Sequence, residues 1–78
     1  MVHVTKHAIS RLMERGNVSE NKAMAILVNK TQPRRHEIIK QVDLLGTARI
    51  ELTDELLAIV AKKNNRYKIV TVRKRKWK

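Results

Sequence analysis

The spacing of apolar residues changes once along this 78-residue chain, at Thr47. Before it, apolar residues recur every three to four positions, which is typical of helices. After it, Ala48, Ile50 and Leu52 alternate with polar residues, which predicts a strand with one face in water. Helices followed by strands predict an α+β domain. We expect two or three N-terminal helices packed on one face of a three- to four-stranded antiparallel sheet. The opposite face is then expected to form a shallow basic cleft with one edge of the helical layer.

Capping residues predict where the first two helices begin and end. Thr5 is a good N-cap and Gly16-Asn17 a good stop, so we expect a helix of about ten residues between them. Ser19 is the N-cap of a second helix, which ends before Pro33. This second helix is apolar around most of its circumference, so we expect it to be buried, with Met24 in the core.

The remaining helix and strands are predicted from the spacing of apolar residues and from the length of each segment. Residues 34–46 have helical spacing and end in glycine, which favours a third helix, and a strand through 36–39 is the alternative. Residues 56–61 and 67–73 are predicted strands joined by a polar hairpin loop. Residues 2–5 alternate and form either a short strand or an extended lead-in. In the last strand, strict alternation predicts one face made of Tyr67, Ile69, Thr71 and Arg73, and the other made of Val70 and Val72.

The first predicted helix carries a stripe of cationic and imidazole side chains. At 100° per residue, His7, Arg11 and Arg15 fall on one side and the apolar residues on the other. Like charges four positions apart repel, so this repetition favours an anion site over simple solubility. Arginine donates two parallel hydrogen bonds to phosphate, and histidine exchanges a proton near neutral pH. The alternative is a solvated helix face.

The charge of the chain indicates a polyanionic partner. Its formal net charge is +11, and residues 56–78 contain nine Lys and Arg but no acidic residue. Nucleic acid is favoured over an anionic membrane or an acidic protein. With only two aromatic residues, Tyr67 and Trp77, a base-stacking platform is excluded, so we expect mainly phosphate contacts and at most one stacked base. The candidate nucleic-acid contacts outside the stripe are Lys6, Arg34, Arg35, Arg73, Lys74, Arg75, Lys76 and Trp77.

Two of these candidate groups have a second interpretation. Arg34 and Arg35 precede the third predicted helix, where a solvated loop is the favoured interpretation. The tail, residues 74–78, either follows phosphate without specificity or is disordered in the free protein. Within it, Trp77 either stacks on a base or covers the end of the sheet, and we favour the second.

Other site classes lack the residues they need. The chain has no cysteine, so neither a disulfide nor a thiolate metal site can form. His3 and His7 have a metal-ligand spacing, but Thr5 caps a helix between them and no third ligand is near, so we expect no metal and no cofactor. No apolar run is long enough for a transmembrane helix or signal peptide. We therefore expect one cytoplasmic domain, residues 1–78, with no membrane partner.

Two segments together resemble a known family. Residues 7–15 have the pattern HA-x-x-R-x-x-x-R, and residues 55–60 and 69–72 supply two apolar strands, the second of them apolar-apolar-Thr-apolar. This resembles a small bacterial and phage domain placed with the RelE-like toxins, in the barnase, EndoU, colicin and RelE group of ribonucleases. The resemblance covers about residues 3–29 and 50–73, whereas residues 30–49 match nothing in it. It implies two N-terminal helices on a four-stranded antiparallel sheet.

The resemblance also implies roles for individual residues. Members of that group cleave RNA without metal, by attack of a 2′-hydroxyl on the adjacent phosphate. His7 would be the general base or acid, Arg11 and Arg15 would bind the scissile phosphate, and Thr71 would point into the cleft as a hydroxyl donor, with Arg73 beside it. A second proton-transfer residue stays open among His36, Lys6 and Tyr67. Because fold kinship supports activity only weakly, whether the chain is an enzyme is left open.

Three functions remain compatible with these residues. The first is an RNA-cleaving, toxin-like enzyme, with RNA favoured over DNA. The second is a non-catalytic RNA- or DNA-binding module of phage or plasmid origin that uses the same cleft. The third is an interaction protein whose basic surface meets an acidic partner, such as an antitoxin segment.

Overall fold

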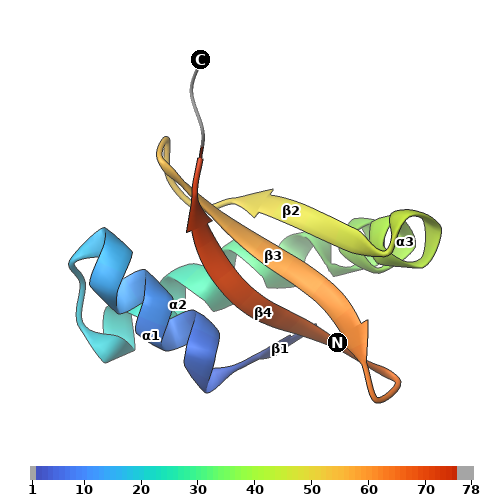
Figure 1. Ribbon diagram of the computed structural model, residues 1–78, viewed down its shortest axis with the longest axis horizontal. Coiled ribbons are helices and arrows are strands. Elements are labelled where there is room, and N and C mark those ends of the chain that lie inside the picture. The colour runs from blue at the N-terminus through green and yellow to red at the C-terminus, as the bar shows by residue number, and fades with distance from the viewer. Residues whose placement is uncertain (1, 76–78) are drawn as a thin grey trace.

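The computed structural model describes residues 2–75 and has the expected α+β class (Figure 1). The third helix is confirmed, and residues 2–4 form a strand rather than a lead-in. In chain order the elements are β1 (Val2–Val4), α1 (Lys6–Gly16), α2 (Glu20–Thr31), the short 3₁₀ turn η1 (Gln32–Arg34), α3 (Arg35–Leu45), β2 (Thr47–Glu51), β3 (Leu56–Lys63) and β4 (Arg66–Lys74).

The four strands form a mixed sheet in the order β1-β4-β3-β2. The last three strands make an antiparallel meander, but β1 pairs parallel to β4, from Val2 opposite Tyr67 to Val4 opposite Ile69. The expectation of a purely antiparallel sheet is therefore wrong at this edge. Parallel neighbours need a long crossover connection, and the segment of helices between β1 and the meander supplies part of it.

The predicted helix boundaries rest on observed caps. The Thr5 and Ser19 hydroxyls accept hydrogen bonds from the backbone N–H groups of Ala8 and Lys22, at 3.2 and 3.3 Å. Gly46 ends α3 with φ 90°, a conformation that favours glycine. The first helix ends at Gly16 with Asn17 as its C-cap, left-handed at φ 54°, as predicted for the Gly16-Asn17 stop. Asparagine tolerates this conformation better than most residues.

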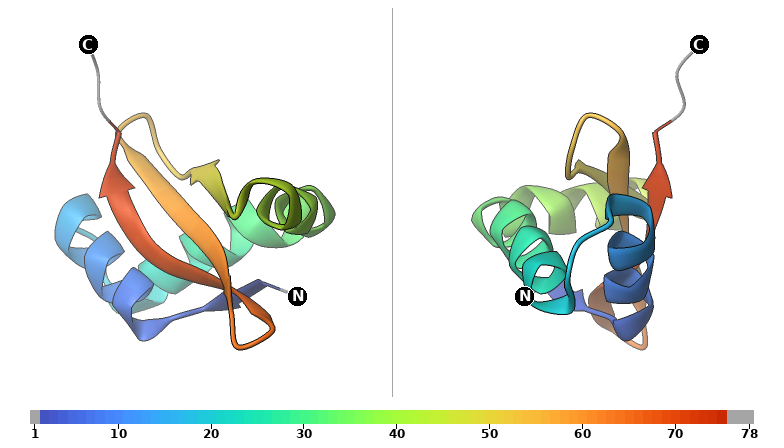
Figure 2. Two further views of the ribbon diagram at one scale, coloured as in Figure 1. Left: turned by 45° about the vertical axis from the view of Figure 1, so that its right-hand side comes forward. Right: turned by 90° about the vertical axis from the view of Figure 1, so that its left-hand side faces the viewer.

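The core lies between the helices and one face of the sheet (Figure 2). On the helix side the buried residues are Ala8, Leu12, Ala23, Leu27, Thr31, Ile38 and Val42, and on the sheet side they include Ala58, Val60, Ile69 and Val72. Met24 is 41% exposed, so its predicted place in the core is wrong. A two-layer domain covers only one side of α2, and Ala23, Leu27 and Thr31 occupy that side.

A bulge in β4 changes which side chains face the open side of the sheet. Val60 pairs with Ile69 but Ile59 pairs with Thr71, which leaves Val70 as an extra residue. Ile69 and Val72 are consequently both buried, whereas Thr71 is half-buried and Arg73 exposed. The predicted strict alternation is therefore wrong, and Ile69 does not share a face with Thr71. One inserted residue reverses the orientation of everything that follows it.

Candidate nucleic-acid interface

A single side chain fixes the start of α1 against β4. The Thr5 hydroxyl donates to the backbone carbonyl oxygen of Ile69 at 2.6 Å while it accepts from the Ala8 N–H. Ala8 and Leu12, one turn apart, are buried below this point. The contact with β4 and the buried pair together determine which flank of α1 faces which neighbour.

Replacing Thr5 by valine is expected to destabilise the domain by about 1–2 kcal/mol, because it removes both the helix cap and the link to β4. Urea denaturation measures this loss. Thr5→Ser is the matched control, since it keeps the hydroxyl, and should retain most of the stability. Equal stability of Thr5→Val and the unchanged protein would show that the link contributes nothing.

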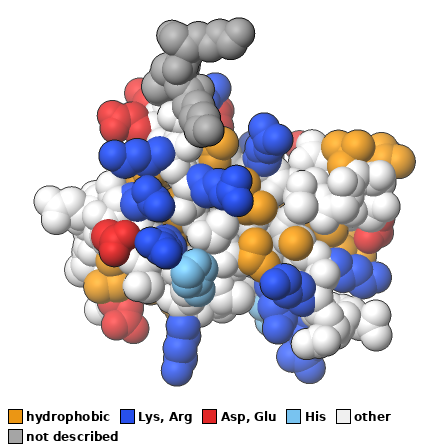
Figure 3. Space-filling model, in the orientation of Figure 1, with side chains coloured by type: hydrophobic (Ala, Val, Ile, Leu, Met, Phe, Trp, Pro, Cys, Tyr) orange, Lys and Arg blue, Asp and Glu red, His pale blue; other side chains and the backbone are white. Residues whose placement is uncertain are grey.

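The two flanks of α1 face different neighbours. Ile9 and Met13 line a small hollow of about 230 Å³ together with Glu20 of α2, so their flank faces α2. The opposite flank carries His7, Arg11 and Arg15 and therefore borders the open face of the sheet. Figure 3 shows Lys, Arg and His side chains gathered over the α1 side of this face. We call these three residues the α1 stripe.

The α1 stripe is accessible to a ligand. His7 and Arg15 are exposed and Arg11 is half-buried. The Arg11 Nη1 lies 3.2 Å from the Glu14 Oε1, with side chains 40% and 67% exposed. An exposed pair of this kind contributes only about 0.3–0.5 kcal/mol, so a phosphate can replace Glu14 at little cost. Arginine also has five N–H donors, and this pair uses few of them.

Beside the stripe, the open face of the sheet holds a shallow hollow of about 580 Å³. Its floor is made by Leu57 and Ile59, which are half-buried on the face opposite the core. Leu57 pairs with Arg73 and Glu51 on the two flanking strands, and Ile59 pairs with Thr71 and Arg49. We call this the sheet hollow; its lining residues are Arg49, Glu51, Leu57, Ile59, Arg73, Lys74 and Arg75.

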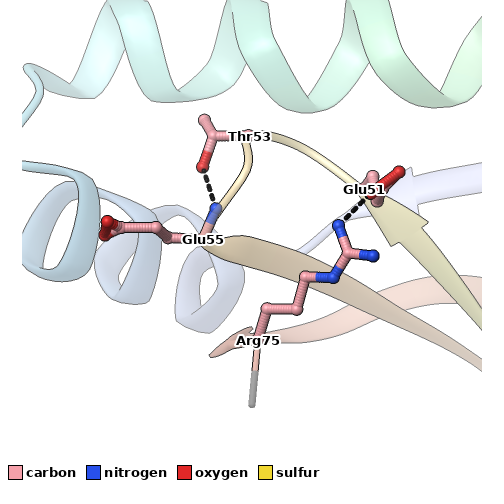
Figure 4. Close-up of polar contacts among 4 residues, drawn as sticks. All are labelled: Glu51, Thr53, Glu55 and Arg75. Carbon is pink, nitrogen blue, oxygen red and sulfur yellow. Dashed lines mark hydrogen bonds and ion pairs between the residues drawn. The ribbon is translucent and has the colours of Figure 1, made fainter. Parts of the chain in front are cut away.

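An ion pair closes one end of the sheet hollow. Arg75 Nη1 donates to the Glu51 carboxylate, which connects the residue after β4 to β2 (Figure 4). The Arg75 N–H also donates to the Glu55 carbonyl oxygen at 2.7 Å. The predicted tail therefore differs from expectation in its first two residues, because Lys74 belongs to β4 and Arg75 is held by these contacts. Lys76 and Trp77 lie outside the described residues.

The structure does not bring every predicted contact to this face. Thr71, Arg73, Lys74 and Arg75 lie on or beside it. Arg34 and Arg35 lie in η1 and α3, within the helix layer, where they contact Glu37 at 3.0 Å and the Gln32 carbonyl oxygen at 3.1 Å. Arg34 and Arg35 therefore lie apart from the open face, and they belong to helical segments rather than to the expected solvated loop. Lys6 lines the smaller hollow of about 230 Å³ between α1 and α2, not the sheet hollow.

The candidates for a second proton-transfer residue also lie away from the α1 stripe. The Tyr67 hydroxyl donates to Asp43 Oδ1 of α3 at 2.7 Å. This hydrogen bond, with partial burial and repulsion from the carboxylate, raises the pKa of Tyr67 above its ordinary value. His36 is in the first turn of α3. Both residues belong to the helix-covered side of the sheet.

Sequence reasoning missed four residues that line the sheet hollow. Arg49 and Glu51 were expected to face water, and Leu57 and Ile59 were expected in a central strand that is apolar on both faces. The alternation of residues 47–52 does indicate which side chains of β2 point outward. A shallow basic cleft on this face was expected, but the strand register that places these four residues around it could not be predicted from the alternation.

Three further properties would indicate a function: a metal site, a membrane-spanning helix and a similarity to known proteins. Among residues 2–75, no three His, Cys, Asp or Glu side chains gather where they could hold a metal ion. None of the helices in this range has the length and apolar character needed to span a membrane. Comparisons with protein-family models, curated protein sequences and solved structures return no match.

Proposed function

We propose that this domain binds single-stranded RNA across the open face of its sheet. The observation that carries the proposal is that the α1 stripe and the sheet hollow lie on the same side of the molecule. Guanidinium groups on this side would hold successive phosphates. The net charge of +11 would draw a polyanion toward the surface.

Three features support RNA as the nucleic acid. The sheet hollow is shallow and has an apolar floor, which suits the splayed bases of a single strand. Helix α1 packs against α2 and β4, so it offers a nucleic acid its cationic flank and does not project from the domain as a helix inserted in a major groove does. The resemblance to RelE-like toxins favours RNA over DNA as the expected substrate class.

The salt dependence of binding tests this proposal. A fluorescently labelled 12-nucleotide RNA should bind with an affinity that falls steeply with salt between 50 and 400 mM. Neutralising about four phosphates predicts a slope of about −3 for log affinity against log salt concentration. Fluorescence anisotropy measures both quantities. A flat slope, or no binding at the lowest salt, would contradict the proposal.

Metal-independent RNA cleavage is a second candidate function. It is favoured by the exposed His7, which lies one helical turn from Arg11. An imidazole can accept the proton of a 2′-hydroxyl while a guanidinium stabilises the phosphate charge that develops. The hydroxyl oxygen would then bond to phosphorus, and the leaving 5′-oxygen would take a proton. Because Tyr67 and His36 lie on the helix side and Lys6 lies on the α2 flank of α1, water is the simplest proton donor.

If the domain cleaves RNA, His7→Ala should lower the cleavage rate by about 100-fold or more. RNA affinity should stay within about twofold, since the variant keeps the guanidinium groups of Arg11 and Arg15 that bind phosphate. Cleavage in EDTA is followed by gel electrophoresis, with 2′,3′-cyclic phosphate ends as the product signature. Arg15→Gln serves as a control that weakens binding without removing the base. RNA left intact by the unchanged protein would exclude this second function and leave binding untouched.

A further inference from the structure

The sheet hollow has a composition that phosphate binding alone does not explain. Its rim carries four cationic residues, but Glu51 stands among them with its side chain 58% exposed. A carboxylate in a phosphate site repels the ligand and weakens binding. The apolar side chains of Leu57 and Ile59 offer no hydrogen bond to phosphate. The sheet hollow thus combines an apolar floor, a cationic rim and one fixed acceptor.

The ion pair with Arg75 makes Glu51 a positioned acceptor. Arg75 holds one carboxylate oxygen, and Leu57 lies between Glu51 and Arg73 in the strand pairing. A carboxylate has about four lone-pair sites, so Glu51 keeps acceptor capacity toward the hollow after bonding Arg75. Arginine here sets the direction of the carboxylate and lowers the cost of the extra negative charge.

We propose that the sheet hollow binds one guanine base of a single-stranded nucleic acid. The base lies flat on Leu57 and Ile59, and its neighbouring N1–H and N2–H donors bond to Glu51. Arg73 and Arg49 hold the flanking phosphates. Guanine presents two adjacent donors on its pairing edge, which matches the two oxygens of a carboxylate, whereas uracil presents one donor between two carbonyl oxygens. The inference rests on the proposed RNA binding and assigns a base preference to the same face.

Heptamer RNAs of equal charge separate base recognition from phosphate binding. We would compare UUUGUUU with UUUUUUU by fluorescence anisotropy at one salt concentration. A positioned bidentate contact to a base discriminates by roughly 5- to 100-fold, and for this open site we expect about 5- to 10-fold in favour of the guanine heptamer. Glu51→Gln should reduce the preference to less than about twofold, because an amide offers one acceptor and adds donors.

Glu55→Gln is the matched control for Glu51→Gln. It removes the same charge from the same end of the sheet, but the Glu55 side chain points away from the Glu51–Arg75 pair (Figure 4). The base preference of the Glu55→Gln variant should equal that of the unchanged protein. Circular dichroism of each variant establishes that the fold is retained. Leu57→Ala provides a second test, since it removes half of the floor and should lower the preference without changing any charge.

Each outcome decides a separate claim. Equal affinity of the unchanged protein for both heptamers would overturn the guanine subsite and leave RNA binding standing. A preference that survives Glu51→Gln would overturn the role of the carboxylate and therefore the subsite as proposed. Failure to bind either heptamer would contradict RNA binding itself, and the subsite with it.

Discussion

Replacing both Arg11 and Arg73 by glutamine is expected to lower RNA affinity by about 30-fold at 100 mM salt. One guanidinium comes from the α1 stripe and the other from the sheet hollow, so the pair samples both parts of the proposed surface. A solvated guanidinium–phosphate contact contributes about 1 kcal/mol, and two such contacts give this factor. The slope of log affinity against log salt should become shallower by about 1.4. Anisotropy titrations at several salt concentrations measure both changes.

The matched control for this variant is Arg34→Gln with Arg35→Gln. It removes the same charge, but both residues lie in the helix layer. If binding depended only on net charge, the two double variants would lose affinity equally. The structure instead predicts a loss of less than about threefold for the control, which is the size expected for long-range electrostatics screened at this ionic strength. Equal losses would remove the evidence for a defined surface.

Ile69→Ala is expected to lower the free energy of unfolding by about 3–4 kcal/mol, the usual cost of an isoleucine truncated in a core. Ile69 is fully buried in β4, the strand that lies between β1 and β3. A domain of this size has about 4–12 kcal/mol of stability in total. The variant should therefore unfold at a much lower urea concentration than the unchanged protein, as followed by circular dichroism.

Leu44→Ala controls for the loss of an aliphatic side chain as such. Leu44 is 78% exposed in α3, so its truncation removes little buried surface. Its stability should stay within about 0.5 kcal/mol of the unchanged protein. If Ile69→Ala were as stable as Leu44→Ala, the placement of β4 in the middle of the sheet would be contradicted.

Local chemistry explains how much of this fold could be predicted. Thr5, Ser19 and Gly46 bound their helices by hydrogen bonds or backbone conformation within a few residues, and these boundaries were predicted. The parallel pairing of β1 depends on contacts more than sixty residues apart, which no local pattern encodes. The bulge at Val70 depends on the pairing with β3, so the face assigned to Ile69 came out wrong.

The candidate site also has one part that local sequence predicts and one part that depends on contacts distant in sequence. The α1 stripe lies within one helix, so helical spacing alone places His7 beside Arg11. The sheet hollow requires three strands in register, and Arg49, Leu57 and Arg73 are brought together only by that register. The position of α1 relative to the hollow depends on the hydrogen bond between Thr5 and Ile69. Sequence reasoning therefore predicted the cations and a basic cleft on the open face, but not the strand register that determines which residues line it.

The most direct test of the proposed surface is a titration of the ¹⁵N-labelled protein with the guanine heptamer, followed by backbone amide shifts. Binding across the open face predicts the largest changes in α1 around Arg11 and in the strands around Ile59 and Arg73. Residues of α3 around Ile38 should change little. Changes confined to α2 and α3, with the open face unaffected, would contradict RNA binding at this surface.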